Sequence, residues 1–242
     1  MNATQTVETQ ETLWQKIVHF LDRYGFTPIG VGVLIVIATL PNFYPFSQEY
    51  ILRWLIMGAF LAAQSVAFDF TAGYINIVNF GFAALLGVGA YTSGILANTT
   101  PFLLFAPGWN PWITIWFGAL FAGLIGFLLG ILTLRLRGIF AAVMAWFVGI
   151  ALMGLVNNLT KLTRGPLGMN PDKFLDSPDN LPYFYIILIM MVGIYIILKI
   201  VTNSNIGLAF KAIGDNLDAA RASGINPTKY LVFNFTRSAF FA

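Results

Sequence analysis

Cysteine is absent from the 242 residues of the sequence, histidine occurs once, and charged residues make up only 10% of the chain. Without cysteine the chain has neither a disulfide nor a thiolate metal site. The lone histidine, His19, has no partner for metal binding or acid–base work, so we expect a surface side chain and no metal site. The net charge of +3 is small and scattered, which excludes a surface for nucleic acid.

Two kinds of chemical motif are also missing. No G-x-x-x-x-G-K-[ST] motif occurs, so the chain has no P-loop to hold the phosphates of ATP. No long apolar stretch carries a pair of ionisable groups placed to act as acid and base. We therefore expect no catalytic residue, no enzyme activity and no cofactor in this chain. Arg53 and Asp69 are the conspicuous charges at the edges of apolar stretches, and we expect each to lie near an interface or to face a wet cavity.

Apolar residues, by contrast, make up 58% of the chain, and the mean hydropathy is +0.77. Such values are typical of a membrane protein, in which about 20 apolar residues cross a hydrocarbon core of roughly 30 Å. The sequence predicts an all-α, polytopic transmembrane helix bundle with about six full spans and a seventh that is cut short. The expected full spans are residues 28–44, 51–70, 77–97, 112–134, 139–157 and 183–201.

The chain divides into four segments by composition. Residues 1–27 form an N-terminal cytoplasmic segment, within which Glu11–Tyr24 has the pattern of an interfacial helix. Residues 28–201 form the bundle, 202–229 form a cytoplasmic loop, and 230–242 begin a further span. The last segment is too short to cross a membrane, so we expect the chain to be incomplete.

Basic residues predict the orientation of the spans. If loop 202–229 is cytoplasmic, that side collects eight basic residues and the opposite side collects four. The N-terminus is then also cytoplasmic. The eight are Lys16, Arg23, Arg135, Arg137, Lys199, Lys211, Arg221 and Lys229, and the four are Arg53, Lys161, Arg164 and Lys173.

The longest charged, helix-forming segment is Asn203–Lys229. Its residues predict one amphipathic helix, with an apolar stripe at helical spacing opposite a charged face, closed by Gly224. Such a helix between two spans lies along the membrane surface, either as an ordinary interfacial helix or as the contact for a partner. The stripe consists of Phe210, Ile213, Leu217 and Ala220, and the charged face of Lys211, Asp215, Asp218 and Arg221.

Residues Asp218–Gly224 read D-A-A-R-A-S-G, which resembles the E-A-A-x-x-x-G signature of permease subunits of bacterial ABC importers, with Asp in place of Glu. The surrounding LAFKAIGDNLDAARASGIN is similar to the version in branched-chain amino acid permeases of the LivM type, which urea and amide permeases share. In that family the segment is the coupling helix, which sits in a groove of the ATPase subunit. The resemblance implies coupling roles for Lys211, Asp215, Asp218, Ala219, Ala220, Arg221 and Gly224.

The resemblance also implies partners and a location. The chain would be the permease subunit of an ATP-driven importer in a bacterial-type inner membrane, with ATP and Mg²⁺ bound by separate ATPase subunits. A second permease subunit and an extracytoplasmic substrate-binding protein would complete the importer. Branched-chain amino acids head the implied substrates, followed by urea, short amides and other amino acids. The external loop 160–181 is a candidate contact for the binding protein, although a plain solvated connection explains its composition equally well.

Residues Phe68–Gly81 interrupt the apolar run with polar side chains and glycines. Irregular backbone at membrane depth needs cover from protein or water. The segment is therefore either a broken or re-entrant element lining the translocation path or a short cytoplasmic turn. On the first interpretation the path is lined by Gly73, Asn76, Asn79 and Gly81. The same region is the one hint of an alternative function, an ion-coupled secondary transporter, which would show intramembrane carboxylates or an ion-coordinating broken helix.

Small residues recur at four-residue spacing in the fourth and fifth expected spans. In lipid such stripes let helix backbones approach and pack by van der Waals contact. We expect them to mark tight packing of the bundle. The stripes consist of Gly118, Ala122, Gly126 and Gly130, and of Ala141, Ala145 and Gly149.

Overall fold

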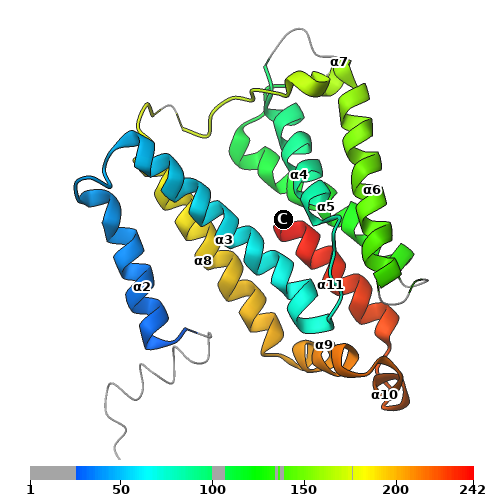
Figure 1. The fold of residues 1–242 in the computed structure, drawn as a ribbon. Helices are drawn as coiled ribbons and strands as arrows, with labels where there is room; N and C mark the ends of the chain where they lie inside the picture. The colour runs from blue at the N-terminus through cyan, green and yellow to red at the C-terminus, as the bar shows by residue number, and fades with distance from the viewer. Residues whose placement is uncertain (1–25, 100–106, 134–135, 137–138, 176) are drawn as a thin grey trace, which may run out of the picture.

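A computed structural model describes residues 26–99, 107–133, 136, 139–175 and 177–242. Helices dominate these residues, which include no strand, so the all-α prediction is confirmed (Figure 1). Three of the expectations lie outside the described residues: the interfacial helix Glu11–Tyr24, His19, and the arginines of the turn at 135–137. The helices are α2 (Pro28–Thr39), α3 (Glu49–Ile75), α4 (Phe82–Ala97), α5 (Pro111–Thr133), α6 (Ile139–Asn158), α7 (Thr160–Thr163), α8 (Leu181–Thr202), α9 (Asn205–Asp215), α10 (Leu217–Ala222) and α11 (Pro227–Phe241), with 3-10 turns at Leu40–Asn42 and Gly165–Leu167.

Four of the helices, α3, α5, α6 and α8, are long and apolar enough to cross a membrane. They correspond to the second, fourth, fifth and sixth expected spans. The first and third expected spans contain shorter helices, of 12 residues in α2 and 16 in α4. The prediction of about six full-length spans is therefore not confirmed by helix length. Two local causes shorten these helices: the 3-10 turn containing Pro41 follows α2, and the chain before Phe82 is not helical.

The helices form two groups joined by α11 (Figure 1). Helices α3 and α8 pack side by side with α2 beyond them, while α4, α5 and α6 pack together in the second group. Helix α11 contacts both α5 and α3, so it connects the groups. Helices α9 and α10 lie at one end of the molecule, and α7 lies at the other (Figure 1).

The small residues of α5 are packing positions, as expected. A Cβ atom added at Gly118 would lie 2.6 Å from the carbonyl oxygen of Gly89 in α4. One added at Gly126 would collide with the Cβ of Ala239, and one at Gly130 would lie 3.1 Å from the Cα of Val232, both in α11. The stripe therefore changes partner along the helix, from α4 in its first half to α11 in its second.

The small residues of α6 hold the start of α4. Gly81, the N-cap of α4, lies so close to α6 that an added Cβ would be 2.5 Å from the carbonyl oxygen of Ala145. Gly149 lies one turn further along α6, and a Cβ added there would lie 3.4 Å from the Cβ of Ala84. Both stripes therefore serve helix packing, which confirms the interpretation drawn from their spacing.

The contrast between crowded and open glycines gives a stability prediction. Gly126→Ala places a methyl group against Ala239, and we expect it to lower the free energy of unfolding by about 1–3 kcal/mol through overpacking. Gly154→Ala in α6 is the matched control, because nothing lies within 4 Å of its hypothetical Cβ. There the change should be neutral or slightly stabilising, since alanine is the better helix former. Thermal unfolding in detergent measures both, and equal melting temperatures would contradict the packing of α5 on α11.

Candidate functional site

The amphipathic segment forms two helices rather than the one predicted from its spacing. Helix α9 begins at a Ser204 cap, whose hydroxyl oxygen accepts a hydrogen bond from the Ile206 amide at 3.2 Å. It ends at Asp215, where Asn216 adopts an extended backbone and caps α10. The Asn216 side-chain oxygen accepts from the Asp218 and Ala219 amides, each at 3.0 Å. An asparagine that can satisfy backbone donors in this way favours a helix start over a helix interior, which explains the break.

The apolar stripe fixes α9 to the membrane helices. Phe210 is fully buried, and its ring lies 5.5 Å from that of Phe70 in α3, measured between centroids. The rings of Tyr230 and Phe233 in α11 lie 6.1 and 6.4 Å away. Ile213 belongs to the same buried cluster. This aromatic core joins α9, α3 and α11 at the end of the bundle.

Two glycines let the backbone of α9 approach the ends of α3 and α8. A Cβ at Gly214 would lie 2.8 Å from the carbonyl oxygen of Tyr74, near the end of α3. A Cβ at Gly207 would collide with the carbonyl oxygen of Thr202, the last residue of α8. Helix α9 is therefore in backbone contact with two of the long helices.

Six of the seven predicted coupling residues are exposed on this helix pair and the turn after it: Lys211, Asp215, Asp218, Ala219, Arg221 and Gly224. Asp218 and Arg221 form an ion pair at 3.6 Å, with side chains that are 75% and 50% exposed. Exposed pairs of this kind contribute only about 0–1 kcal/mol to stability, so both groups can exchange partners at little cost.

Ala220 differs from the other six. It is 3% exposed and belongs to the buried cluster that contains Phe210. The side chain of Ala220 therefore packs against this chain's own core, while Ala219 beside it faces outward. The burial of Ala220 agrees with its place in the apolar stripe, whereas the resemblance to the signature gave both alanines a coupling role.

Gly224 turns the chain from α10 into α11. Its φ of +82° lies in the region that favours glycine, and nothing lies within 4 Å of its hypothetical Cβ. Glycine is needed here for conformation rather than for space. The Ile225 amide donates to the Ala220 carbonyl at 3.0 Å and closes the turn. Pro227 then begins α11.

The four residues predicted to line a path do not lie together. Gly73 and Asn76 are exposed at the end of α3, where Asn76 takes a left-handed conformation with φ of 57°. Asn79 and Gly81 are buried on the α6 side. Residues 76–81, which are not helical, connect the end of α3 to the start of α4 (Figure 1). The Asn79 side-chain oxygen accepts from the Gly81 amide at 3.0 Å, while its amide nitrogen is buried without a partner.

Two residues of α11 that the sequence analysis did not single out attach this helix to α3. The fully buried Asn234 donates to the Phe70 carbonyl at 2.8 Å, and Ser238 donates to the Ala67 carbonyl at 2.7 Å. Four-residue spacing places both on one face of α11. From this spacing of two polar residues, the sequence could have predicted a polar contact between α11 and a neighbouring helix. Arg237 lies between them in sequence and stacks over the Phe233 ring at 4.5 Å.

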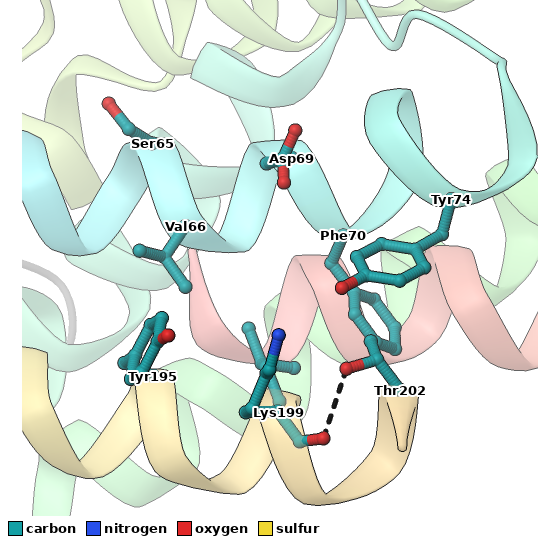
Figure 2. A pocket seen from close by; sticks show the side chains of 9 residues that line it. Ser65, Val66, Asp69, Phe70, Tyr74, Tyr195, Lys199 and Thr202 are labelled. Atoms are coloured by element: carbon teal, nitrogen blue, oxygen red, sulfur yellow. Dashed lines mark hydrogen bonds between the residues drawn. The ribbon is translucent and has the colours of Figure 1, made fainter. Parts of the chain in front are cut away.

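The two edge charges of α3, which we expected near an interface or facing a wet cavity, line separate cavities. Arg53 lines a cavity of about 520 Å³ with Lys173 and Asn180. Asp69 lines one of about 370 Å³ with Lys199 (Figure 2). In the described part of the chain, no three acidic or histidine side chains gather where they could hold a metal ion.

Apolar helices of membrane-crossing length, with an amphipathic helix pair fixed at one end, define a multi-pass membrane protein. Residues 50–242 match the profile of a family described as the permease component of branched-chain amino acid transport systems. This match covers most of the chain, and the chain belongs to that family.

Three curated relatives show how distant the relationship is. The chain is 25% identical over 199 residues to the high-affinity branched-chain amino acid transport system permease protein LivM of Salmonella typhimurium, and the same holds for LivM of Escherichia coli. These alignments cover 70% of this chain and 45% of each relative. The nucleoside ABC transporter permease protein NupC of Lactococcus lactis is 28% identical over 172 residues, or 64% of this chain and 52% of the relative. The chain thus spans about half the length of the curated relatives it matches, and no solved structure matches it.

The Asn216 cap gives a local prediction. Asn216→Ala removes the acceptor for two α10 amides and should destabilise that helix by about 1 kcal/mol. Hydrogen exchange at residues 217–222 should then become faster, while exchange in α5 stays unchanged. Asn216→Asp keeps the acceptor and serves as the control. Equal exchange in the alanine and aspartate variants would contradict the cap.

Proposed function

We propose that this chain is the permease subunit of an ATP-driven ABC importer and that α9 and α10 are its contact with the ATPase. The observation that carries the proposal is the two-sided character of this helix pair. Its apolar side is buried on α3 and α11 through Phe210, whereas its charged side is exposed. A surface helix that only anchored the chain would present its apolar side to lipid.

The contacts of α11 offer a route for motion from the ATPase to the spans. Helix α10 leads through the Gly224 turn directly into α11. Helix α11 packs on the glycine face of α5 and donates hydrogen bonds to α3. A displacement of α9 and α10 would therefore shift α11 against two of the long helices. In this proposal ATP and Mg²⁺ bind the separate ATPase subunits, whose closure supplies the displacement.

The charges on the helix pair suit a partner groove of mixed sign. Lys211 and Asp215 occupy α9, and Asp218 and Arg221 occupy α10, so the four charges sum to zero. Such a surface gains specificity from matched pairs across an interface rather than from a net attraction. Ala219 lies among these charges and leaves room for close approach by a partner.

The orientation follows from the same contact. If α9 and α10 face the cytoplasm, then α7 and the connection to α8 face the opposite side of a bacterial-type inner membrane (Figure 1). There, residues 160–181 are the proposed contact for an extracytoplasmic substrate-binding protein. A second permease subunit would complete the pore. Branched-chain or related amino acids are the proposed substrates because of the family match and the LivM relatives, with urea and short amides behind them. The NupC relative adds nucleosides to the candidates.

A specific observation favours one alternative, an ion-coupled secondary transporter. Asp69 lies within a long apolar helix and faces a cavity, and the chain is irregular between α3 and α4. Uptake in cells separates the two functions. The importer requires ATP, so uptake should stop on ATP depletion and persist when an uncoupler collapses the ion gradient while ATP is maintained. The opposite pattern would support the alternative.

The two adjacent alanines of α10 provide a matched test of the ATPase contact. Ala219→Leu adds bulk to an exposed position and should abolish association with the ATPase, measured by co-purification, while the melting temperature stays unchanged. Ala220→Leu adds the same bulk inside the core and should lower the free energy of unfolding by about 1–3 kcal/mol.

The proposal would be contradicted if Ala219→Leu bound the ATPase and supported substrate-stimulated ATP hydrolysis as the unaltered chain does. Lys161→Gln on α7, at the opposite end of the molecule, controls for nonspecific effects of surface substitutions in the co-purification with the ATPase, which contains no substrate-binding protein.

A further inference from the structure

The cavity between α3 and α8 carries two opposite charges. Asp69 contributes a carboxylate from α3, and Lys199 contributes an ammonium group from α8. Tyr74 and Tyr195 add hydroxyl groups to the lining, and Phe70 and Leu198 add apolar surface. The volume of about 370 Å³ is enough for a small polar group with room for water.

The two charges face one space without neutralising each other. Figure 2 shows the Lys199 ammonium nitrogen directed from α8 toward α3, the helix that carries Asp69. Among the described residues, Asp69 and Lys199 form no ion pair with each other. The ion pair present there joins Asp218 and Arg221. A molecule with a primary ammonium group and an anionic group would complement both side chains at once.

The position of the cavity along α3 and α8 indicates that this molecule comes from the membrane. Lys199 lies three residues before the end of α8 and Asp69 six before the end of α3, about 5 Å and 9 Å along the helix axes. Charged groups so close to the end of a span lie near the level of lipid headgroups. Tyrosines are enriched at the same level because their rings are apolar and their hydroxyls polar.

The cavity also has an apolar approach along the length of α3. Met57, Leu61, Ser65 and Asp69 follow one another at four-residue spacing, and all four are exposed. Met57 is 52% and Leu61 53% exposed, so the row is apolar away from the cavity and polar beside it. On the other side of the cavity, Phe70 and Leu198 belong to the buried cluster shared with α9 and α11.

We propose that this cavity binds the headgroup of a zwitterionic aminophospholipid of the phosphatidylethanolamine type. The lipid phosphate accepts hydrogen bonds from the Lys199 ammonium group, and the lipid ammonium donates to the Asp69 carboxylate. The acyl chains lie along the row that contains Leu61 and Met57. A free amino acid carries the same two charges, but it has no chains to cover this row. The site does not depend on the contact with the ATPase.

The test uses the full chain, purified in detergent and stripped of lipid, with melting followed by the fluorescence of its six tryptophans. Phosphatidylethanolamine, phosphatidylcholine and phosphatidylglycerol are added separately in mixed micelles. Phosphatidylethanolamine should raise the melting temperature most and saturably, because only its headgroup combines a phosphate with a primary ammonium that donates hydrogen bonds. Asp69→Asn should remove its advantage over phosphatidylcholine. Lys199→Gln should weaken the response to phosphatidylethanolamine by about tenfold in concentration, as expected for loss of a charge-assisted hydrogen bond.

Matched controls come from the opposite end of the molecule. Lys161→Gln and Asp179→Asn make the same chemical changes at exposed positions away from the cavity, and they should keep the lipid response of the unaltered chain. Native mass spectrometry provides a second measurement, the number of phosphatidylethanolamine molecules retained by each variant.

Three results would overturn the proposal. Protection by free leucine without lipid, lost in both cavity variants, would assign the cavity to a transported amino acid. Loss of stability without lipid in each single variant, restored by combining Asp69→Lys with Lys199→Asp, would show an ion pair between α3 and α8. The same response to all three lipids in the unaltered chain and both cavity variants would show only nonspecific lipid contact.

Discussion

The burial of Phe210 is the interaction on which the rest of the arrangement depends. This ring has no exposed surface and contacts aromatic side chains of both α3 and α11. Full burial of such a side chain contributes about 1.5–3 kcal/mol, and aromatic pairs add to this. Because Phe210 belongs to a helix that is charged on its other side, the same contact both holds α9 in place and turns its charged face outward. The glycines at 207 and 214 allow the close approach that this contact requires.

A second constraint comes from the membrane, where polar groups must find partners within the protein. Asn234 and Ser238 bond to backbone carbonyls of α3, so α11 is joined to α3 by polar contacts and to α5 by close packing of small residues. At the surface end, the exposed Asn216 cap satisfies two amides of α10 and fixes the start of that helix. Contacts of different kinds thus converge on α11, the helix into which the surface helices lead.

The sequence predicts the structure well where the pattern within one helix is enough to define it. The expected bounds of α5, α6 and α8 differ from the observed ones by only one or two residues, because long apolar runs define them. It was less informative where tertiary contacts decide. The spacing of Phe210, Ile213, Leu217 and Ala220 fits one continuous helix, and only the hydrogen bonds of Asn216 reveal two. Likewise α4 starts at Phe82 rather than Ile77, in contact with α6. The apolar stripe correctly placed Ala220 inward, but the pattern could not show that Asp69 and Lys199 line one cavity.

The central claim is that the charged face of α9 and α10 lies in the cytoplasm and contacts an ATPase. The absence of cysteine makes the direct measurement possible, since a single thiol can be introduced by Asp215→Cys, and by Lys173→Cys as the control near the other end. A membrane-impermeant maleimide is applied to inverted and to right-side-out vesicles, with and without the ATPase subunits. We expect the thiol at 215 to react only in inverted vesicles and to be protected by the ATPase, while the thiol at 173 reacts only in right-side-out vesicles. Reaction at 215 from the outside, or unchanged reaction when the ATPase is present, would contradict this claim.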